Sequence, residues 1–348
     1  MTATVHLGVA DAYQLAVAAL AQLDMAAGDA ERIARHLLDS QLRGDATGLA
    51  RILLLAQNPA AGGGAAELIT ESPTTALIDG NGNYGFVAAE DATALAIAKA
   101  RTAGVAVVGV NNHSFTGSLS YYLRAVTEAN MVGIALSTLH AAEGNARVAP
   151  HGGASAVLST NPLAIAVPTD DDPIIWDAST ATMNGGRLMY HIEAGRDLDD
   201  GIGLDRDGNP TRDPKAAWTG AVRAWGGHRG SGLAVMLQLL GLLADVDVHS
   251  GEFAYLVIVI DPAAFGDPDR FRRRASRFAE VVRSSPPAAG FDRVRMPYDG
   301  SRERLAASER DGVDLPRDIF DRLTALSRGQ RPEPAIAGAR ADGKGPGA

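Results

Sequence analysis

Apolar residues repeat in a helical rhythm over the first 57 positions. Between residues 15 and 23, and again between residues 33 and 38, apolar side chains recur every three or four positions, which places them on one side of a helix. Asp11 and Asp29 precede these two runs and belong to the residue types that cap helix N-termini. A third apolar run covers residues 49–56 and ends before Asn58 and Pro59. We therefore predict three helices, followed by a glycine-rich linker at residues 60–66.

After the linker, the apolar runs become short and continuous, as in buried strands. Residues 87–104 predict a helix that stops at a glycine, and residues 232–244 predict a buried helix, because this apolar run is too short to span a bilayer and carries Gln238. The pattern predicts an α+β chain with a helical N-terminal part, a mixed α/β body and a disordered Pro/Gly/Ala-rich tail at residues 331–348. The predicted strands cover residues 74–80, 105–110, 132–138, 162–169, 173–179 and 254–262.

Charge and composition narrow the functional classes. The chain has 348 residues, with 41 acidic against 32 basic side chains and a net charge of −9. Nucleic-acid binding normally requires a basic surface, so we expect no nucleic-acid partner. Cysteine is absent, which excludes disulfides, thiolate metal ligands and a thiol nucleophile. The first residues lack the basic start and apolar stretch of a signal peptide, and we expect a soluble cytoplasmic protein without a membrane partner.

The segment GNGNYG, residues 80–85, matches the pattern of dinucleotide-binding turns and lies between a predicted strand and a predicted helix. Two features count against that reading. Asp79 would place a carboxylate beside the diphosphate, and the next strand ends in Asn111 and Asn112 instead of an acidic residue that could hold a ribose. Glycine-rich turns also follow strands for conformational reasons alone. We therefore interpret the segment as a turn and do not predict a Rossmann fold.

Four polar stretches could carry chemistry, at residues 111–122, 149–153 with 159–162, 176–180 and 225–232. Each sets hydroxyl, amide or imidazole groups beside glycine or next to an apolar strand, which suits a ligand with many hydrogen-bonding atoms. Singly, each could equally be a capped turn. The last stretch, WGGHRGSG, leads directly into the apolar helix, whose positive end suits a phosphate, and Arg229 adds charge there.

The eight histidines show no spacing typical of a metal site, so we expect no metal. His36 lies beside a helical apolar stretch and is interpreted as structural. His113, His151 and His228 lie in the polar stretches and are the candidates for proton transfer, with a hydrogen-bonded structural role as the alternative for each.

The order of these motifs resembles the type-2 malate/L-lactate dehydrogenase family. The resemblance extends from about residue 10 to residue 328. The matching motifs are NNHSFTGSLSYY, APHGG, STNPLAIAVP, IIWDAST, DRDGNPTRDPKAA, WGGHRGSGLAVMLQLL, VIDPAAF and VRMP, in this order. The family includes sulfolactate and ureidoglycolate dehydrogenases and reductases of cyclic imino acids.

The resemblance implies a fold that is not of the Rossmann type. It implies a helical domain built from both chain ends, residues 1–72 plus about 296–330, and an NAD(P)-binding body at residues 73–295 with a largely antiparallel sheet. It also implies NAD(P)H-dependent hydride transfer on a small carboxylate-bearing 2-oxo, 2-hydroxy or imino substrate, and a homodimer. The choice between NADH and NADPH stays open. The cofactor residues that the resemblance implies are Thr160, Asn161, Pro162, Asp177, His228, Arg229 and Gly230.

Two positions depart from the family pattern. The family carries DSHGxxR where this chain has DATGLAR, so Thr47 replaces a histidine. Alignment on Gly117 and the tyrosine pair at 121–122 puts Phe115 at the usual proton-donor position. His113 would lie about 7 Å away on the same face of an extended segment. His113, Tyr121 or a bound water could supply the proton instead.

Loss of both histidines favours an imine over a ketone. A positioned acid contributes roughly 10²–10⁴-fold to ketone reduction, whereas a protonated imine accepts hydride without an obligatory enzyme acid. Arg51 is expected to clamp the substrate carboxylate, with a solvent-facing arginine as the alternative, and Arg147 is a second anion-binding candidate. The altered positions also fit a cofactor-binding pseudoenzyme or a non-redox enzyme, which is the rival hypothesis.

Overall fold

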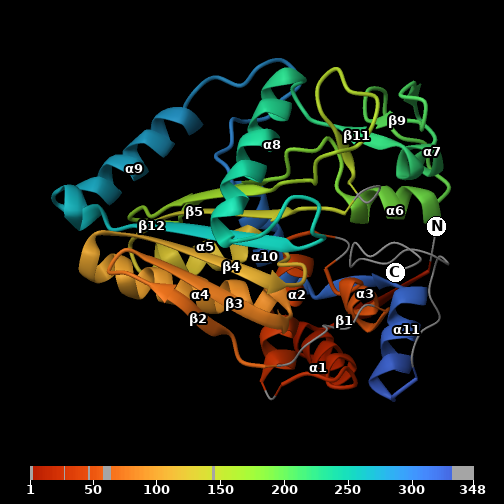
Figure 1. Ribbon diagram of the computed structural model, residues 1–348, viewed down its shortest axis with the longest axis horizontal. Coiled ribbons are helices and arrows are strands. Elements are labelled where there is room, and N and C mark those ends of the chain that lie inside the picture. The colour runs from red at the N-terminus through yellow and green to blue at the C-terminus, as the bar shows by residue number, and fades with distance from the viewer. Residues whose placement is uncertain (1–2, 27, 46–47, 58–63, 143–145, 331–348) are drawn as a thin grey trace.

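A computed structural model describes residues 3–26, 28–45, 48–57, 64–142 and 146–330. Thr47 and the tail predicted at residues 331–348 lie outside the described residues. Within the described chain, a large sheet forms the centre, a helical part joins the two ends of the chain, and a small second sheet lies beside them (Figure 1).

The large sheet has seven strands, and its order places residues from distant parts of the chain side by side. Five of its six strand pairs are antiparallel, and only β3 and β4 run parallel. The predicted largely antiparallel, non-Rossmann body is therefore confirmed. In spatial order the strands are β2 (Glu67–Glu71), β3 (Thr75–Asn83), β4 (Val105–His113), β12 (Phe253–Ile260), β5 (Val132–Leu139), β7 (Leu163–Val167) and β8 (Ile174–Ala178).

Helices cover both faces of this sheet. Helices α4 (Gly85–Ala103) and α5 (Leu119–Glu128) pack on one face, and α8 (His228–Gly241) crosses the other (Figure 1). Alanines of α4 and apolar residues of β4 and β12 form the core between them, since small side chains let the helix lie close to the strands. The prediction of a buried apolar helix at residues 232–244 is only partly correct. Met236 and Leu243 of this segment are 56% and 64% exposed, so one apolar side of the segment has no cover among the described residues.

The two ends of the chain share one hydrophobic core. Strand β1 (Thr4–Leu7) pairs antiparallel with β13 (Val313–Pro316), and α11 (Arg317–Ser327) packs on α1 (Val9–Leu20). The remaining helices of this part are α2 (Asp29–Leu42), α3 (Arg51–Gln57) and α10 (Asp299–Asp311). The predicted domain limits themselves stay a prediction, and β2 already joins the large sheet before residue 73.

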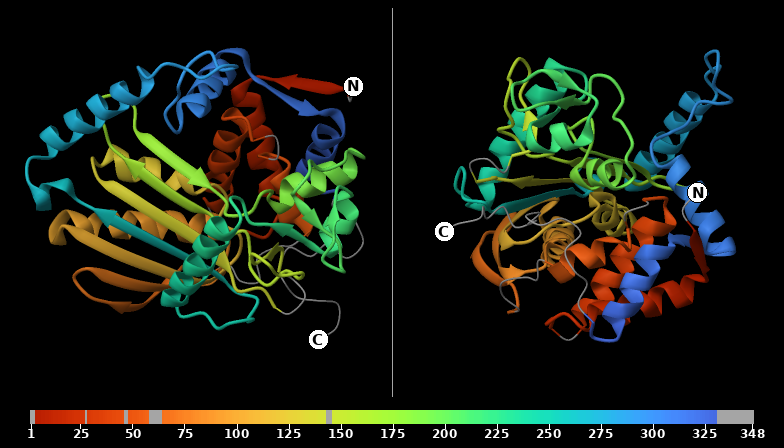
Figure 2. Two further views of the ribbon diagram at one scale, coloured as in Figure 1. Left: turned by 90° about the horizontal axis from the view of Figure 1, so that it is seen from above. Right: turned by 90° about the vertical axis from the view of Figure 1, so that its right-hand side faces the viewer.

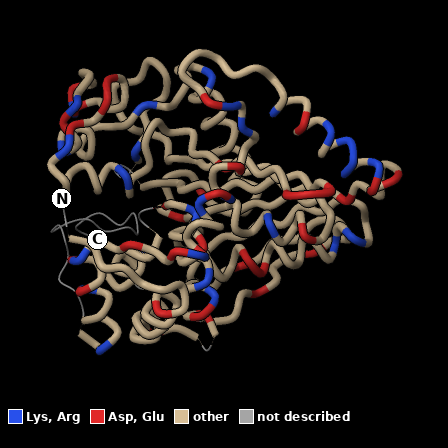
Figure 3. Tube along the Cα trace, turned by 180° about the vertical axis from the view of Figure 1, so that it is seen from behind, with Lys and Arg blue, Asp and Glu red and all other residues tan. Residues whose placement is uncertain are grey.

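The rest of the chain forms a small sheet and a projecting helix. Helix α9 (Pro268–Arg283) is rich in arginine, which accounts for its row of basic positions in Figure 3, and it projects from the body in Figure 2. Its sparse apolar residues explain why the sequence pattern did not predict it. The small sheet contains β10 (Pro210–Thr211), β9 (Gly203–Leu204), β11 (Ala221–Arg223) and β6 (Val148–Ala149), with α6 (Gly185–Glu193) and α7 (Pro214–Thr219) beside it.

Both predicted helix caps are wrong. Helix α1 begins two residues before Asp11 and takes Gly8 as its N-cap, without a side-chain bond. Helix α2 begins at Asp29 itself, and its N-cap is Gly28, at φ 89°. The Asp29 carboxylate instead accepts a hydrogen bond from Asn83 Nδ2 at 3.3 Å, so a tertiary contact takes the oxygen that a cap would use.

Candidate functional site

Two of the polar motifs meet at the N-terminus of α5. Asp177, on β8, points its carboxylate at the first turn of this helix. Its Oδ2 accepts hydrogen bonds from the Ser120 backbone N–H at 2.8 Å and from the Ser118 hydroxyl at 3.1 Å. An anion is stabilised there by the free N–H groups and by the helix dipole. Asp177 is therefore fixed in orientation by α5, whether or not it also contacts a cofactor.

A second set of bonds joins three of the motifs predicted to bind the cofactor. The carbonyl oxygen of Thr160 accepts from the Thr180 backbone N–H at 3.0 Å and from the Ser179 hydroxyl at 2.9 Å. The indole N–H of Trp225 donates to the Ser179 carbonyl at 2.7 Å. The STNP, DAST and WGGHRGSG segments are therefore in direct contact, although Thr160 and Trp225 are 65 positions apart in the sequence.

Asn161 lies between Thr160 and Pro162, and its side chain is committed to the fold. It is fully buried, and its Nδ2 donates to the carbonyl of Ala234 on α8 at 3.0 Å, while its Oδ1 accepts from the Ser159 hydroxyl. This contact fixes the segment against α8. Direct contact of residues 160–162 with a cofactor stays a prediction.

The start of α8 is an exposed, positively charged edge. Gly226 and Gly227 both have φ 62°, a left-handed conformation that favours glycine, and no heavy atom lies within 4 Å of the position of a Cβ on Gly226. His228 and Arg229 are exposed, and the ring of His228 lies 6.0 Å from that of His151. Gly230 is buried, and a Cβ there would lie only 1.9 Å from the carbonyl oxygen of Trp225, so this position requires glycine.

Phe115 and Arg51 contact each other. The guanidinium carbon of Arg51 lies 4.9 Å from the centre of the Phe115 ring, and its Nη2 lies 3.2 Å from Asp45 Oδ2. The Arg51 side chain is only 20% exposed, so it is not the solvent-facing arginine of the alternative reading. Phe115 also packs edge-on against Phe86, with ring centres 5.8 Å apart. An aromatic face thus fixes one side of the guanidinium.

His113 ends β4 in a buried environment. Its Nδ1 lies 2.6 Å from the carbonyl oxygen of Ser114, so Nδ1 carries the proton and donates it there. Burial lowers the pKa of His113 to about 4, against a small opposing effect of that bond. Its Nε2 has no hydrogen-bond partner among the described residues. At neutral pH His113 is therefore an acceptor and holds no acidic proton.

Tyr121 retains its proton. Burial raises the pKa of its hydroxyl, with Glu90 raising it further and Arg124 opposing. The ring lies 4.3 Å from that of His36, and the Arg124 guanidinium lies 5.1 Å from its centre.

Arg147 belongs to the neighbourhood of the small sheet. Its guanidinium carbon stacks 4.5 Å above the ring of Trp218, and burial lowers its pKa. The structure gives it no contact with Arg51 or Phe115. Its role as an anion-binding residue stays a prediction.

Sequence reasoning missed several residues of this site. Ser118 and Ser120 lie in the polar stretch but were not singled out, and Phe86 lies directly after the GNGNYG segment. Helix α5 was not predicted, so nothing in the sequence pointed to the contact with Asp177. His36 was interpreted as structural, and the structure places it in contact with Tyr121.

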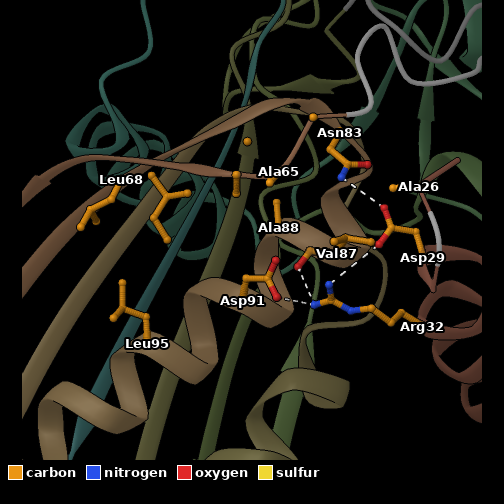
Figure 4. Close-up of a pocket in the computed structure, with 14 residues that line it drawn as sticks. Ala26, Asp29, Arg32, Ala65, Leu68, Asn83, Val87, Ala88, Asp91 and Leu95 are labelled. Atoms are coloured by element: carbon orange, nitrogen blue, oxygen red, sulfur yellow. Dashed lines mark hydrogen bonds and ion pairs between the residues drawn. The ribbon is translucent and has the colours of Figure 1, made fainter.

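A cavity of about 480 Å³ lies beside the GNGNYG segment, between α2, α4 and the strands β2 and β3 (Figure 4). Leu68, Leu95 and several alanines form its apolar wall. At the opposite wall, Arg32 pairs with Asp91 at 2.5 Å and with Asp29 at 3.9 Å, which leaves acidic groups beside the segment.

The GNGNYG segment is not the turn that the sequence predicts. Strand β3 continues to Asn83, and its register against β4 shifts between Asp79 and Asn83. Asp79 Oδ1 accepts hydrogen bonds from the Asn81 N–H and from Asn112 Nδ2, both at 2.7 Å. These bonds fix the irregular end of the strand, where Asn81 and Gly82 have positive φ.

The described residues contain neither a membrane-spanning helix nor a metal-binding cluster. No helix there is long and apolar enough to cross a membrane. No group of three or more histidine or carboxylate side chains in the described ranges is arranged to hold a metal ion.

Comparison with known proteins agrees with the motif order. A family model described as malate/L-lactate dehydrogenase matches residues 8–324. The chain belongs to the malate/L-lactate dehydrogenase family. The family resemblance drawn from the motifs is thereby confirmed.

Relatives of the chain within this family act on several small carboxylates by name. The malate/(S)-sulfolactate dehydrogenase of Methanothermus fervidus is 32% identical over 276 residues, which cover 75% of this chain and 78% of the relative. The Δ1-pyrroline-2-carboxylate/Δ1-piperideine-2-carboxylate reductase of Pseudomonas putida is 33% identical over 264 residues, covering 72% and 74%. The crystal structure of a dehydrogenase from Sinorhizobium meliloti superposes with a TM-score of 0.85 at 29% identity, covering 94% of this chain and 99% of that one.

Proposed function

We propose that this protein is an NAD(P)H-dependent oxidoreductase that reduces a small carboxylate-bearing imine. The single observation that carries the choice of imine over ketone is the pair formed by Arg51 and Phe115. The arginine is presented on an aromatic face at the place where the family pattern has a proton donor. The neighbouring His113 carries no acidic proton at neutral pH.

The residues at the start of α8 fit a nicotinamide dinucleotide. Gly226 leaves open space beside it, and the exposed His228 and Arg229 follow directly in the chain. The positive end of a 14-residue helix adds to this charge and favours a diphosphate. When bound there, the nicotinamide would supply the hydride. The choice between NADH and NADPH stays open.

Reduction of an iminium does not require a proton from the protein, whereas reduction of a ketone does. An iminium carbon accepts the hydride, and the electron pair of the C=N bond moves to nitrogen, which gives a neutral amine. The protein then has to hold the carboxylate, orient the ring and exclude water. Arg51 would hold the carboxylate through the N–H groups not facing Asp45. A ketone would require a proton for the developing alkoxide, for which Tyr121 is the remaining protonated side chain of the predicted set.

A homodimer and a cytoplasmic location belong to the same proposal. The homodimer is supported by an exposed apolar surface formed by α8 and the 3-10 turn that follows it, Leu242–Ala244, where Met236, Leu239 and Leu243 are each more than half exposed. Size-exclusion chromatography with light scattering measures the mass in solution, and a monomer at micromolar concentration would contradict the dimer.

The proposed function is tested by side-by-side assays. Consumption of NADH and of NADPH is followed with pyruvate, oxaloacetate and the five- and six-membered cyclic imino acids. We expect turnover of the cyclic imines to exceed that of both keto acids. Rapid reduction of pyruvate or oxaloacetate with little reaction of the imines would refute the choice of substrate.

The rival is a cofactor-binding protein without hydride transfer, which the replacement of the family histidine by Phe115 also favours. Calorimetric titration with each cofactor separates the two hypotheses. Tight binding of cofactor without oxidation in the presence of any imine, keto acid or hydroxy acid would favour the pseudoenzyme.

A further inference from the structure

His36 lies in the middle of α2 and is surrounded by aromatic rings. Its side chain is 1% exposed. The centre of its ring lies 4.3 Å from that of Tyr121, 4.9 Å from that of Phe86 and 5.2 Å from that of Tyr122. An apolar side chain would satisfy such packing equally well, so the presence of an imidazole calls for a polar reason.

The polar contact of His36 is a single, well-defined bond. Its Nε2 accepts a hydrogen bond from the backbone N–H of Ser118 at 3.0 Å. Nε2 must therefore carry a lone pair, and the proton of the neutral ring is on Nδ1. A protonated imidazole would turn a donor toward the Ser118 N–H and lose this bond.

Burial and nearby charges favour the neutral ring. Burial lowers the pKa of His36 well below the ordinary value, and Arg51 of α3 and Arg124 of α5 lower it further. Each arginine has an acidic partner: Arg124 pairs with Asp39 at 2.6 Å, and Arg51 with Asp45 at 3.2 Å. The two tyrosines of α5 that touch the ring stay protonated, because burial raises their pKa.

The neighbouring backbone is shaped to approach this ring. Gly117 has φ 76°, and a Cβ on it would lie 2.4 Å from His36 Nε2 and 2.5 Å from the Phe86 ring. Glycine is therefore required both by conformation and by the close contact. The approach brings the segment from Gly117 to Tyr121 against α2.

This segment also holds Asp177. Ser118 donates its backbone N–H to His36 and its hydroxyl to Asp177, and Ser120 donates its N–H to the same carboxylate oxygen. A chain of hydrogen bonds thus runs from α2, through the start of α5, to β8 of the large sheet. The chain joins the helical part of the molecule to the strand that carries a predicted cofactor residue.

We propose that His36 is a positioning residue of the reaction, which holds the start of α5 through its neutral Nε2 and thereby places Tyr121 and Asp177. The proposal rests on the proposed function for its effect on rate, but the bond itself can be tested without substrate. An apolar packing role alone would require the ring and not the acceptor atom.

Two substitutions separate the acceptor from the ring. His36→Gln keeps an acceptor oxygen at a similar reach and loses the ring, whereas His36→Phe keeps a ring and loses the acceptor. We expect His36→Phe to lower kcat about tenfold to a hundredfold, with cofactor affinity within about twofold of the wild type, because small displacements of reacting groups cost that much. We expect His36→Gln to recover most of kcat.

Hydrogen–deuterium exchange of the peptide that contains Ser118 is measured on the same proteins without substrate. We expect faster exchange in His36→Phe and near-normal exchange in His36→Gln. Unchanged exchange and unchanged kcat in His36→Phe would overturn the proposal. The same holds if kcat falls only in proportion to the folded fraction. Faster exchange in a protein that turns over no substrate would leave the bond established and refute the proposed function.

Discussion

Acid should destabilise this protein through His113 by an amount that the structure allows to be worked out. The imidazole is 7% exposed, and burial lowers its pKa to about 4, against 6.5 in an unfolded chain. Between these two values the unfolded state binds a proton that the folded state does not. The stability is therefore fully present above pH 6.5 and is lost as the pH falls from 6.5 toward 4.

The size of the effect follows from the two pKa values. Over the whole window the loss is about 3 kcal/mol, and between pH 7 and pH 5 it is about 2 kcal/mol, at 1.36 kcal/mol for each pKa unit. Replacement of His113 by glutamine removes this proton-binding difference. It also removes the bond to Ser114, so the variant is expected to be less stable at pH 7.

The assay is urea unfolding, at one protein concentration, of the wild type and His113→Gln at pH 7 and pH 5. The free energy of unfolding of the wild type should fall by about 2 kcal/mol more than that of the variant over this interval. His151→Gln, at an exposed histidine, controls for the removal of an imidazole as such. Parallel pH dependences in wild type and His113→Gln would refute the reasoning, because they would mean that His113 is protonated in the folded state as readily as in the unfolded one.

Three further predictions concern the site and the core. Arg229→Ala should weaken cofactor binding roughly tenfold or more in a calorimetric titration, since a charge-assisted bond to a phosphate is worth about 1.5–3 kcal/mol; unchanged affinity would count against the site at α8. Arg51→Lys should raise KM for carboxylate-bearing substrates about tenfold at unchanged cofactor affinity, because lysine cannot form the planar two-bond fork or stack on Phe115 in the same way; an equally active lysine variant would rule out the clamp. Tyr255→Phe should lower the free energy of unfolding by about 1 kcal/mol, because its buried hydroxyl lies 2.9 Å from that of Thr93, and a stability equal to the wild type would show that the bond contributes nothing.

The elements with a strong apolar period were predictable from the sequence. Strands β4 and β5 and helix α4 lie within three residues of their predicted bounds, because each carries a continuous or periodic apolar run. Helix α5 was missed, since its first turn lies in a polar stretch whose serines and tyrosines suit a loop equally well. The caps were wrong because the competing partner of Asp29, Asn83, comes from 54 residues away and is invisible to local spacing.

For the candidate site, too, local sequence signals could be predicted and tertiary contacts could not. The motif order identified the family, and the glycines and charges at the start of α8 are local signals whose predicted role in cofactor binding stays a prediction. The partner of Asp177 and the contact of His36 with Ser118 depend on α2, α5 and β8 meeting in space, which no single-chain pattern encodes. The stacking of Arg51 on Phe115 was likewise hidden, because 64 residues separate them.

The pairing of β1 with β13 has a consequence for how the molecule is made. Thr4 and Pro316 are direct partners in this two-stranded sheet, and apolar residues of α1 and α11 share one core. During synthesis the first helices leave the ribosome more than 250 residues before the segment that completes their core. Contacts of such long sequence separation form slowly, and the uncovered face of α1 is exposed to aggregation until then. Expression at low temperature or with chaperones should therefore raise the soluble yield, and a premature stop before α11 should remove it.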